Sequence, residues 1–406
     1  MDAATPSVLR AETIMAPGCS LVVQRVNGPV ATELFLLGQP SAESLGAGTQ
    51  AEVIYRAIAR ILVAAGGDFQ SLVTETVFLR NLDADIGAVR AARQKVLGTS
   101  GTVDPRPAMT EIEQPPLDPH ACLQVLVHAV LPRQGAWRTE TIHVRPACAC
   151  AECARMHGLR IQVADEVRFH AGGIFGTGAE AYAQALSMFE LAEALLQEAG
   201  LEFSDVARTW IHLRDIDRDY PALNRARRTF FAARGIDPAP ASTGIGAGPA
   251  MAAHDLCLGL YAFRAGRGSC RNVMTSPTLN EAMEYGADFV RGMRIEEANK
   301  VALHVSGTAS IDADGRTLHV NDFAGQAKRT LVNIAALLNK QGASFRDVVS
   351  AVTYLKRPDD ADHLRGILSD AGFDGFPNAM VVAPVCRPEL LCEIEVLAAL
   401  PEKLAP

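Results

Sequence analysis

The sequence lacks long apolar runs and lacks the pattern of an export signal. No stretch approaches the roughly 18 consecutive apolar residues that a membrane-spanning helix needs. The first residues, MDAATPSVLRAETIMAPG, do not place a basic segment before an apolar one, as a secretory signal would. We therefore expect a cytoplasmic protein without a membrane partner.

The sequence also has no excess of positive charge. The 38 Lys and Arg residues stand against 46 Asp and Glu, which gives a formal net charge of −8. A negative chain is repelled by phosphate backbones and by anionic membrane surfaces. Nucleic acid is therefore not an expected partner. The length of 406 residues is enough for two or three domains.

An internal repeat is the main feature that is present. The pattern G-x-x-F-x-x-[LV] occurs three times, beginning at Gly66, Gly200 and Gly342. Each occurrence is followed by Leu and a cation, an acidic run, a proline and an apolar terminal segment, always in this order. Such co-registered marks indicate three tandem copies of one supersecondary unit.

Periodicity within each copy predicts its helices and strands. Residues 51–67 and 325–342 have apolar residues at three- and four-residue steps and end in glycine, which is typical of an amphipathic helix. Short runs rich in β-branched and aromatic residues, such as TWIHL, predict strands. A second helix is expected after each acidic run, followed by two strands. Helices would cover one sheet face, and three copies would bury their bare faces against one another with cyclic pseudo-symmetry.

Several stretches resemble a known superfamily. They are VARTW at 206–210, GIDPAPASTGIGA at 235–247, SPTLNEAMEYGADFVR at 276–291, SGTASI at 306–311, DFAGQ at 322–326 and LLCEIE at 390–395. Together with the repeat, they resemble the reactive-intermediate deaminases, or YjgF superfamily, and copies two and three resemble its chorismatases. Members of this superfamily form homotrimers with sites between subunits.

The resemblance implies an α/β (α+β) fold of three tandem chorismate-mutase-like, YjgF-type units that form an intramolecular pseudo-trimer. The expected boundaries are 1–135 for copy one, 136–165 for a Cys-rich connector, 166–268 for copy two and 269–406 for copy three. The chain would then be a monomeric pseudo-trimer, and pairing of two chains into a dimer stays open.

One position of the terminal strands differs between the copies. Alignment of HAVLP with LAALP puts Gln124, Cys257 and Glu393 in register, and only Glu393 carries a carboxyl group. A partly desolvated carboxylic acid can act as a general acid. The resemblance also implies that Glu393 is the catalytic acid, which would protonate the vinyl carbon of an enol ether. A solvent-facing strand residue is the alternative.

A carboxylic acid substrate needs cations and room beside the backbone. Arg208 of ARTW and Arg291 of DFVR are the candidate carboxylate ligands, because the guanidinium fork matches a carboxylate. Arg214 and Lys356 directly precede the acidic runs, and residues in such places more often lie in solvent at the end of a strand. Small residues at Thr243, Gly244, Gly246 and Ala247 predict either ligand contact or a strand-end turn. Tyr354 would orient a ring hydroxyl, or serve only in packing.

The odd number of cysteines, nine, argues against a disulfide framework. Three of them lie together in the connector. Cys148, Cys150 and Cys153, with His157, could bind zinc or iron, although their spacing matches no diagnostic motif. A connector with incidental thiols is the alternative.

The function that follows from the resemblance is cleavage of the enolpyruvyl ether of chorismate or a related cyclic acid, with release of pyruvate and no required cofactor. Imine deamination of the YjgF type is a second hypothesis. Deaminases of the superfamily hold the substrate carboxylate with an arginine where this chain has Met109, Ser242 and Asn378-Ala379. A non-catalytic metal-binding protein is the third.

Overall fold

The structure is a computed structural model that describes residues 7–41, 45–98, 107–133, 137–144, 156–250, 253–280 and 288–401. Its elements fall into three groups in chain order. The first group is β1 (Ser7–Val8), β2 (Glu12–Ala16), β3 (Cys19–Asn27), β4 (Ala31–Pro40), α1 (Ala47–Ala64), β5 (Leu72–Leu79), α2 (Leu82–Leu97), β6 (Ala108–Glu113) and β7 (Leu123–Pro132). The second is β8 (Trp137–Ile142), β9 (His157–Val163), β10 (Glu166–Phe175), α3 (Ala181–Glu198), β11 (Val206–Leu213), α4 (Ile216–Arg234), β12 (Ala241–Gly246), β13 (Gly248–Pro249) and β14 (Leu256–Arg264). The third is β15 (Cys270–Met274), β16 (Gly292–Glu296), β17 (Val301–Thr308), α5 (Phe323–Asn339), β18 (Val348–Leu355), α6 (Ala361–Asp370), β19 (Asn378–Val382) and β20 (Cys392–Leu400).

The three sheets share one strand order. It reads β4-β7-β5-β6 in copy one, β10-β14-β11-β12 in copy two and β17-β20-β18-β19 in copy three. In every copy the last pair of strands is parallel and the other two pairs are antiparallel. The predicted fold of three tandem α+β units is therefore confirmed.

The strand register agrees with the sequence alignment of the terminal strands. The seventh residues of β5, β11 and β18 pair with Gln124, Cys257 and Glu393 respectively. The predicted equivalence of these three positions is therefore confirmed.

The repeated G-x-x-F pattern forms the same turn in each copy. Gly66, Gly200 and Gly342 follow the first helices with φ of 84°, 72° and 75°, a left-handed conformation that favours glycine. Each following phenylalanine opens one turn of 3₁₀-helix that leads directly into β5, β11 or β18. The pattern therefore marks the reversal from the outer helix into the sheet.

The acidic runs lie in a different place from the one we predicted. We predicted that these runs come before the second helices. In copies one and two they instead belong to the helices, because α2 begins at Leu82 and α4 at Ile216. Asn81 and Asp215 cap these helices, and the following acidic residues lie in the first turn. Short polar caps and negative charges both stabilise helix N-termini, which explains the extension.

The second sheet also begins earlier than predicted. Strands β8 and β9 lie within residues 136–165, the expected connector, and β9 pairs with both β8 and β10. Part of this segment therefore adds an edge to the sheet of copy two. Strand β15 at Cys270–Met274 opens the sheet of copy three, next to the predicted boundary at 269.

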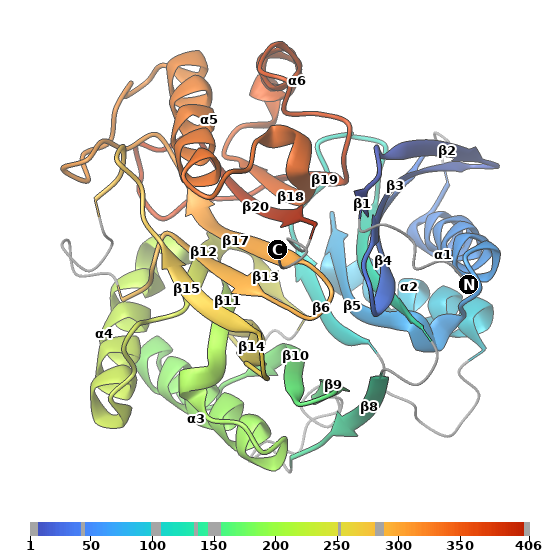
Figure 1. Cartoon of the computed structure of the whole chain (residues 1–406). Coiled ribbons are helices and arrows are strands. Elements are labelled where there is room, and N and C mark those ends of the chain that lie inside the picture. The colour runs from blue at the N-terminus through green and yellow to red at the C-terminus, as the bar shows by residue number, and fades with distance from the viewer. Residues whose placement is uncertain are drawn as a thin grey trace.

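The helices lie at the outside of the molecule and the sheets face its centre (Figure 1). Each copy has its own apolar core between its helices and its sheet. A further apolar cluster joins all three copies, with Leu37 and Phe78 from the first, Ile245 from the second, and Tyr354 and Val381 from the third. The bare sheet faces are thus buried against one another, which creates junctions between copies.

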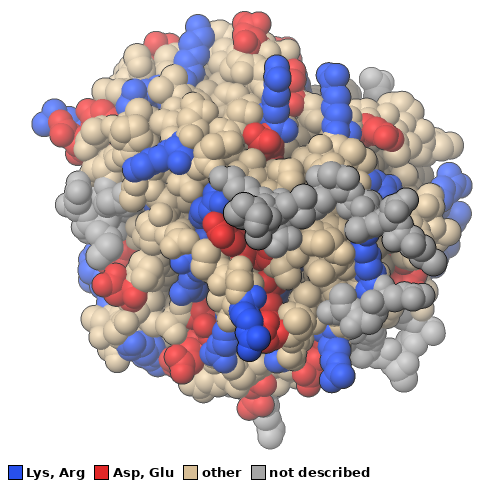
Figure 2. Space-filling model, in the orientation of Figure 1, with Lys and Arg blue, Asp and Glu red and all other residues tan. Residues whose placement is uncertain are grey.

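On the face shown in Figure 2, basic and acidic side chains are interspersed among uncharged ones. No helix within the described ranges is long and apolar enough to cross a membrane.

Candidate active site

The junctions between copies repeat the same three structural positions with different residues. One position is the third residue of β5, β11 or β18; one is on the neighbouring parallel strand; and one is on the terminal strand of the next copy. The strand pairings within each copy make three sets of positions equivalent: Thr74, Arg208 and Ser350; Thr110, Thr243 and Ala379; and Gln124, Cys257 and Glu393. At the second junction, Thr243 of copy two and Glu393 of copy three both lie beside Gly307. Only the second junction combines a guanidinium group with a carboxyl group at these positions.

Glu393 lies against a glycine of the neighbouring strand. A Cβ atom added to Gly307 would lie 1.9 Å from Oε1 of Glu393 and 3.0 Å from Cγ2 of Thr243. The pairing of β17 with β20 shifts between Val305 and Thr308, which is the mark of a β-bulge. Bulges re-aim side chains and are frequent beside active sites. Gly307 therefore makes the space in which the carboxyl group of Glu393 lies.

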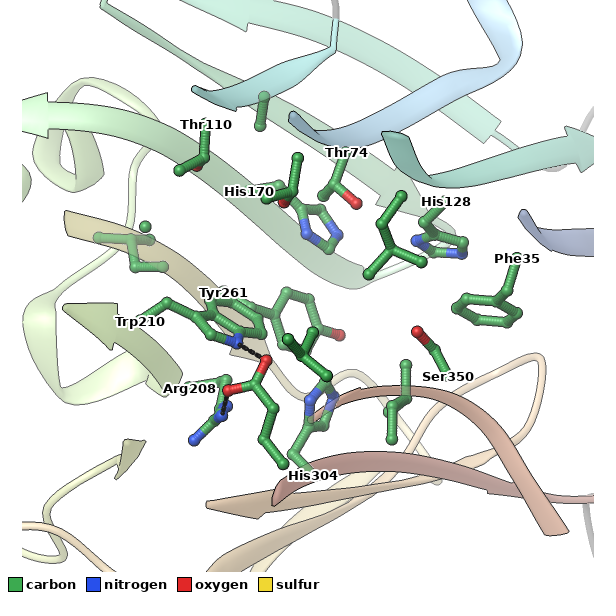
Figure 3. Close-up of a pocket in the computed structure, with 18 of the residues that line it drawn as sticks. Phe35, Thr74, Thr110, His128, His170, Arg208, Trp210, Tyr261, His304 and Ser350 are labelled. Atoms are coloured by element: carbon green, nitrogen blue, oxygen red, sulfur yellow. Dashed lines mark hydrogen bonds and ion pairs between the residues drawn. The ribbon is translucent and has the colours of Figure 1, made fainter. Parts of the chain in front are cut away.

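Arg208 connects copies two and three. Its Nη2 donates hydrogen bonds to Oγ1 of Thr243 at 2.5 Å and to Oε2 of Glu395 at 2.8 Å. Trp210 donates to the other oxygen of Glu395 at 3.0 Å, and both bonds to Glu395 are drawn in Figure 3. The backbone N–H of Gly307 also donates to Oγ1 of Thr243, at 2.9 Å.

The second terminal nitrogen of Arg208, Nη1, is buried and has no hydrogen-bond partner among the described residues. An unpaired buried N–H group is costly, so such a group is expected to have a partner when the protein functions. Nη1 is thus available to a bound carboxylate.

The carboxyl group of Glu393 favours its protonated form. Burial, followed by the negative charge of Glu395, raises its pKa to about 8, although Arg208, Arg291 and Arg387 act in the opposite direction. A carboxylic acid with this pKa holds its proton at neutral pH and can donate it. Glu393 is 4% exposed, so a solvent-facing role does not fit its surroundings.

Arg291 lies close enough to affect the pKa of Glu393. It is buried, and it donates to the backbone oxygen of Asn280 at 2.8 Å and to Oδ1 of the same residue at 3.1 Å. Its guanidinium carbon lies 5.6 Å from the centre of the Phe289 ring. Arg214 and Lys356 donate to backbone carbonyl groups at the ends of their strands.

The small residues of β12, together with Ala247, allow close packing at the junction. The backbone N–H groups of Gly246 and Ala247 donate to Pro384 and Leu213, so these amides are already occupied. Gly246 is pressed against Pro384, and a Cβ atom on Gly244 would lie 3.1 Å from the ring of Tyr220. Glycine here allows neighbouring groups to approach; ligand contact at this stretch stays a prediction.

Tyr354 is buried directly opposite Glu393 in the strand pairing. Burial and the nearby carboxylates raise its pKa well above the ordinary value, and its hydroxyl hydrogen-bonds Glu395. Its ring lines a cavity at the centre of the molecule, which Glu395 also lines. Tyr354, Glu393 and Glu395 therefore share one face of the sheet of copy three, and two of them reach the cavity.

The predicted metal cluster falls largely outside the described residues. Cys148, Cys150 and Cys153 are not among them. His157 is described, and its Nε2 lies 2.9 Å from the backbone oxygen of Pro107. In the part of the chain that the structure describes, no group of three or more His, Cys, Asp or Glu side chains is placed to hold a metal ion.

Three members of this junction were missed by sequence reasoning: Gly307, Glu395 and Tyr220. Gly307 lies in the SGTASI stretch and Glu395 in the EIE stretch, so both belong to stretches that carry the resemblance to the superfamily. Tyr220 lies in the first turns of α4, where nothing in the local pattern distinguishes it from a packing residue.

Comparison with known proteins agrees with this arrangement. Residues 280–400 match the family described as Endoribonuclease L-PSP. The chain is 30% identical over 260 residues to the 3-hydroxybenzoate synthase of Streptomyces hygroscopicus, covering 57% of this chain and 73% of that protein. It is 28% identical over 219 residues to the chorismatase of Streptomyces hygroscopicus, covering 48% of this chain and 61% of that protein. The matched region thus spans less than two thirds of that chorismatase.

A crystal structure of a chorismatase has the same fold. It superposes with a TM-score of 0.61 at 19% sequence identity, covering 91% of this chain and 99% of the other. The chain therefore belongs to the YjgF superfamily and, within it, to the family of the 3-hydroxybenzoate synthase. Both relatives are named as enzymes, and the similarity supports an enzyme for this chain as well.

Proposed function

We propose that this protein cleaves the enolpyruvyl ether of chorismate or a related cyclic acid, and releases pyruvate and a hydroxylated ring acid. One observation carries the proposal: among the described residues, only the junction between copies two and three brings a buried guanidinium group, Arg208, near a buried carboxyl group with a raised pKa, Glu393. The names of the two enzyme relatives support the choice of substrate.

Glu393 is the general acid of this proposal. It transfers its proton to the terminal vinyl carbon of the enol ether, which leaves an oxocarbenium centre on the adjacent carbon. Water attacks that carbon and returns one proton to Glu393. The resulting hemiketal collapses, the ether C–O bond breaks, and pyruvate and the ring alcohol leave. One water molecule is consumed, the reaction needs no oxidant or reductant, and we propose that it requires no cofactor.

The arginines hold the substrate carboxylates in this proposal. Nη1 of Arg208 has no partner among the described residues, whereas Nη2 of the same guanidinium group is held by Thr243 and Glu395 at the junction. Arg291 supplies a second buried cation close to Glu393. A substrate with two carboxylates would use one cation for each, because paired charges are needed where water is excluded.

Incubation of the purified chain with chorismate, with pyruvate measured over time, tests the proposal. Glu393→Gln keeps the shape of the side chain but removes the transferable proton, so we expect the rate to fall by about 10²–10⁴-fold. Arg214→Gln is the control, because it also replaces a charged side chain by glutamine, and the hydrogen bonds given above for Arg214 go to backbone oxygens at the end of its strand. If the wild-type chain releases no more pyruvate than Glu393→Gln, the proposal is wrong.

Imine deamination is the weaker candidate. At the position where deaminases of the superfamily hold the substrate carboxylate, Ser242 is buried and its backbone N–H donates to Ser306 at 2.9 Å. A hydroxyl group cannot replace the bidentate contact of an arginine. Faster ammonia release from a dehydratase-generated imine would favour this candidate instead.

A further inference from the structure

A cavity of about 180 Å³ lies at the centre of the molecule, where the three sheets meet. All three copies contribute to its walls, and Figure 3 shows the side chains that surround it. Those that the following argument uses are Phe35, Thr74, Arg168, His170, Tyr261, His304 and Ser350. Arg208, which contacts the substrate in the proposal above, also lines this cavity, whereas Glu393 does not, so the cavity adjoins the proposed site but does not contain its acid.

Flat aromatic faces line one part of the cavity. The ring centres of His170 and Tyr261 are 4.6 Å apart and stacked, and those of Tyr261 and His304 are 5.3 Å apart and stacked. Phe35 and His128 form a parallel pair at 4.5 Å from the side of copy one. Burial lowers the pKa values of His170 and His304 well below the ordinary value, so both rings are uncharged at neutral pH. These walls suit a planar ring.

Arg168 supplies a donor beside these rings. It is 3% exposed, and its Nε and Nη1 form ion pairs with Glu166 at 2.6 Å and Glu297 at 2.9 Å. Its Nη2 is buried and has no hydrogen-bond partner among the described residues. A buried guanidinium nitrogen without a partner is unfavourable, and a carboxylate oxygen is the partner that it binds best.

We propose that this cavity binds a small planar carboxylic acid with one ring, whose carboxylate accepts a hydrogen bond from Arg168. The ring lies among His170, Tyr261 and His304. The size fits, since an apolar cavity of about 150 Å³ binds benzene. Binding here does not depend on the reaction proposed at Glu393.

Calorimetric titration of the full-length chain with benzoate tests the proposal. Ser350 lines the cavity, and a leucine in its place fills part of that space. We expect Ser350→Leu to weaken benzoate binding by about tenfold or more and Ser350→Ala to change it by less than about twofold, because only leucine adds volume. Equal affinity in all three proteins, or no binding to the wild type, would overturn the proposal.

A second variant covers the case in which Ser350→Leu does not fold, as judged by its melting curve. Thr74 lines the same cavity from copy one, and Thr74→Leu fills it from the opposite side, with Thr74→Val as control. The same loss of benzoate affinity is expected for Thr74→Leu alone.

The position of the ligand is a separate readout. Crystals of Glu393→Gln soaked in 3-bromobenzoate locate the ring by the anomalous signal of bromine. A peak inside the cavity, beside His170, Tyr261 and His304, supports the proposal. The proposal is overturned if the only bromine peak lies beside Thr243 or if the cavity holds water alone. It is also overturned if bromobenzoate is an adventitious additive only, bound at the surface. Failure of chorismate cleavage would leave this result unchanged, so the two proposals fail separately.

Discussion

Glu393 and Glu395 lie two residues apart on β20, yet their surroundings give them different chemistry. Glu395 accepts hydrogen bonds from Arg208 and Trp210 and forms an ion pair with Arg208. Burial, and after it the charge of Glu395, raises the pKa of Glu393. Burial and a neighbouring carboxylate therefore both favour the protonated form of Glu393.

The pH dependence of catalysis follows from this arrangement. If protonated Glu393 is the acid, the rate at limiting chorismate should be constant near neutral pH and fall as pH rises through about 8, where the group loses its proton. The sign is that of a required acid, with activity on the low-pH side of its pKa. A pH profile of kcat/KM for pyruvate release measures it. A profile that rises through pH 8 would mean that the ionised form is required, and would contradict the assignment.

Gly307→Ala is expected to disturb the same group by steric means. An added Cβ atom would lie 1.9 Å from the Glu393 carboxyl oxygen, so this carboxyl group must move. A misplacement of about 1 Å can lower a rate about 10²-fold, and we expect a loss of this order in kcat with the fold retained.

Gly366→Ala is the matched control for Gly307→Ala, because it adds the same methyl group in α6, where nothing lies within 4 Å. Pyruvate assays and melting curves on both variants separate displacement from unfolding. Unchanged kcat in a folded Gly307→Ala protein would show that this contact does not position Glu393.

At the scale of elements, the reversal between the first helix and the sheet is the unit that the chain repeats. Gly342 lies at the end of α5 with φ of 75°, and Ser344 caps the 3₁₀ turn that follows. Gly66 and Gly200 have the same conformation after α1 and α3. A left-handed conformation costs an L-residue energy that glycine avoids.

Replacement of these glycines by alanine should therefore be similarly costly in all three copies. Gly66→Ala, Gly200→Ala and Gly342→Ala each force alanine into positive φ, and we expect each to lower the free energy of unfolding by about 1 kcal/mol. Added space is not the cause, because nothing lies within 4 Å of the new Cβ atom at any of the three sites. Denaturant unfolding curves measure the losses. A stabilising effect at any of the three would contradict the shared turn.

The sequence predicted elements well because these elements follow local rules. Glycine after an amphipathic helix and β-branched runs after the turn depend on neighbouring residues, and the register of Glu393 followed from aligning copies. The approach of Gly307 to Glu393 and the cavity beside Arg168 depend on how separate copies pack, which no local pattern records. Strands β8 and β9 were not predicted, because the Cys- and Ala-rich stretch between them led us to treat the whole segment as a connector.

At the scale of the whole molecule, buried charges connect the three copies. Lys300 of copy three donates to both oxygens of Glu33 in copy one, at 2.7 and 2.9 Å, and to Glu297 at 2.8 Å. Arg168 of copy two pairs with Glu297 at 2.9 Å. Burial acts to raise the pKa of Glu33, but Lys300, His128 and Arg168 outweigh it and hold that pKa well below the ordinary value. The carboxylate is thus ionised inside the molecule.

Removal of the central cation should therefore weaken the association of all three copies. Lys300→Met leaves Glu33 and Glu297 buried with fewer partners, and breaking such a pair costs about 3–5 kcal/mol in free energy of unfolding. The double variant Glu297→Gln with Lys300→Met should recover part of the loss, because one uncompensated charge is then absent. Arg316→Met is the control, since its ion pair with Asp314 is exposed and should not contribute measurably. Unfolding curves followed by circular dichroism compare the four proteins. Because Lys300 contacts both copy one and copy three, we expect Lys300→Met to lower a single transition for the whole chain; an early transition of one copy alone would mean that the copies fold independently of this cluster.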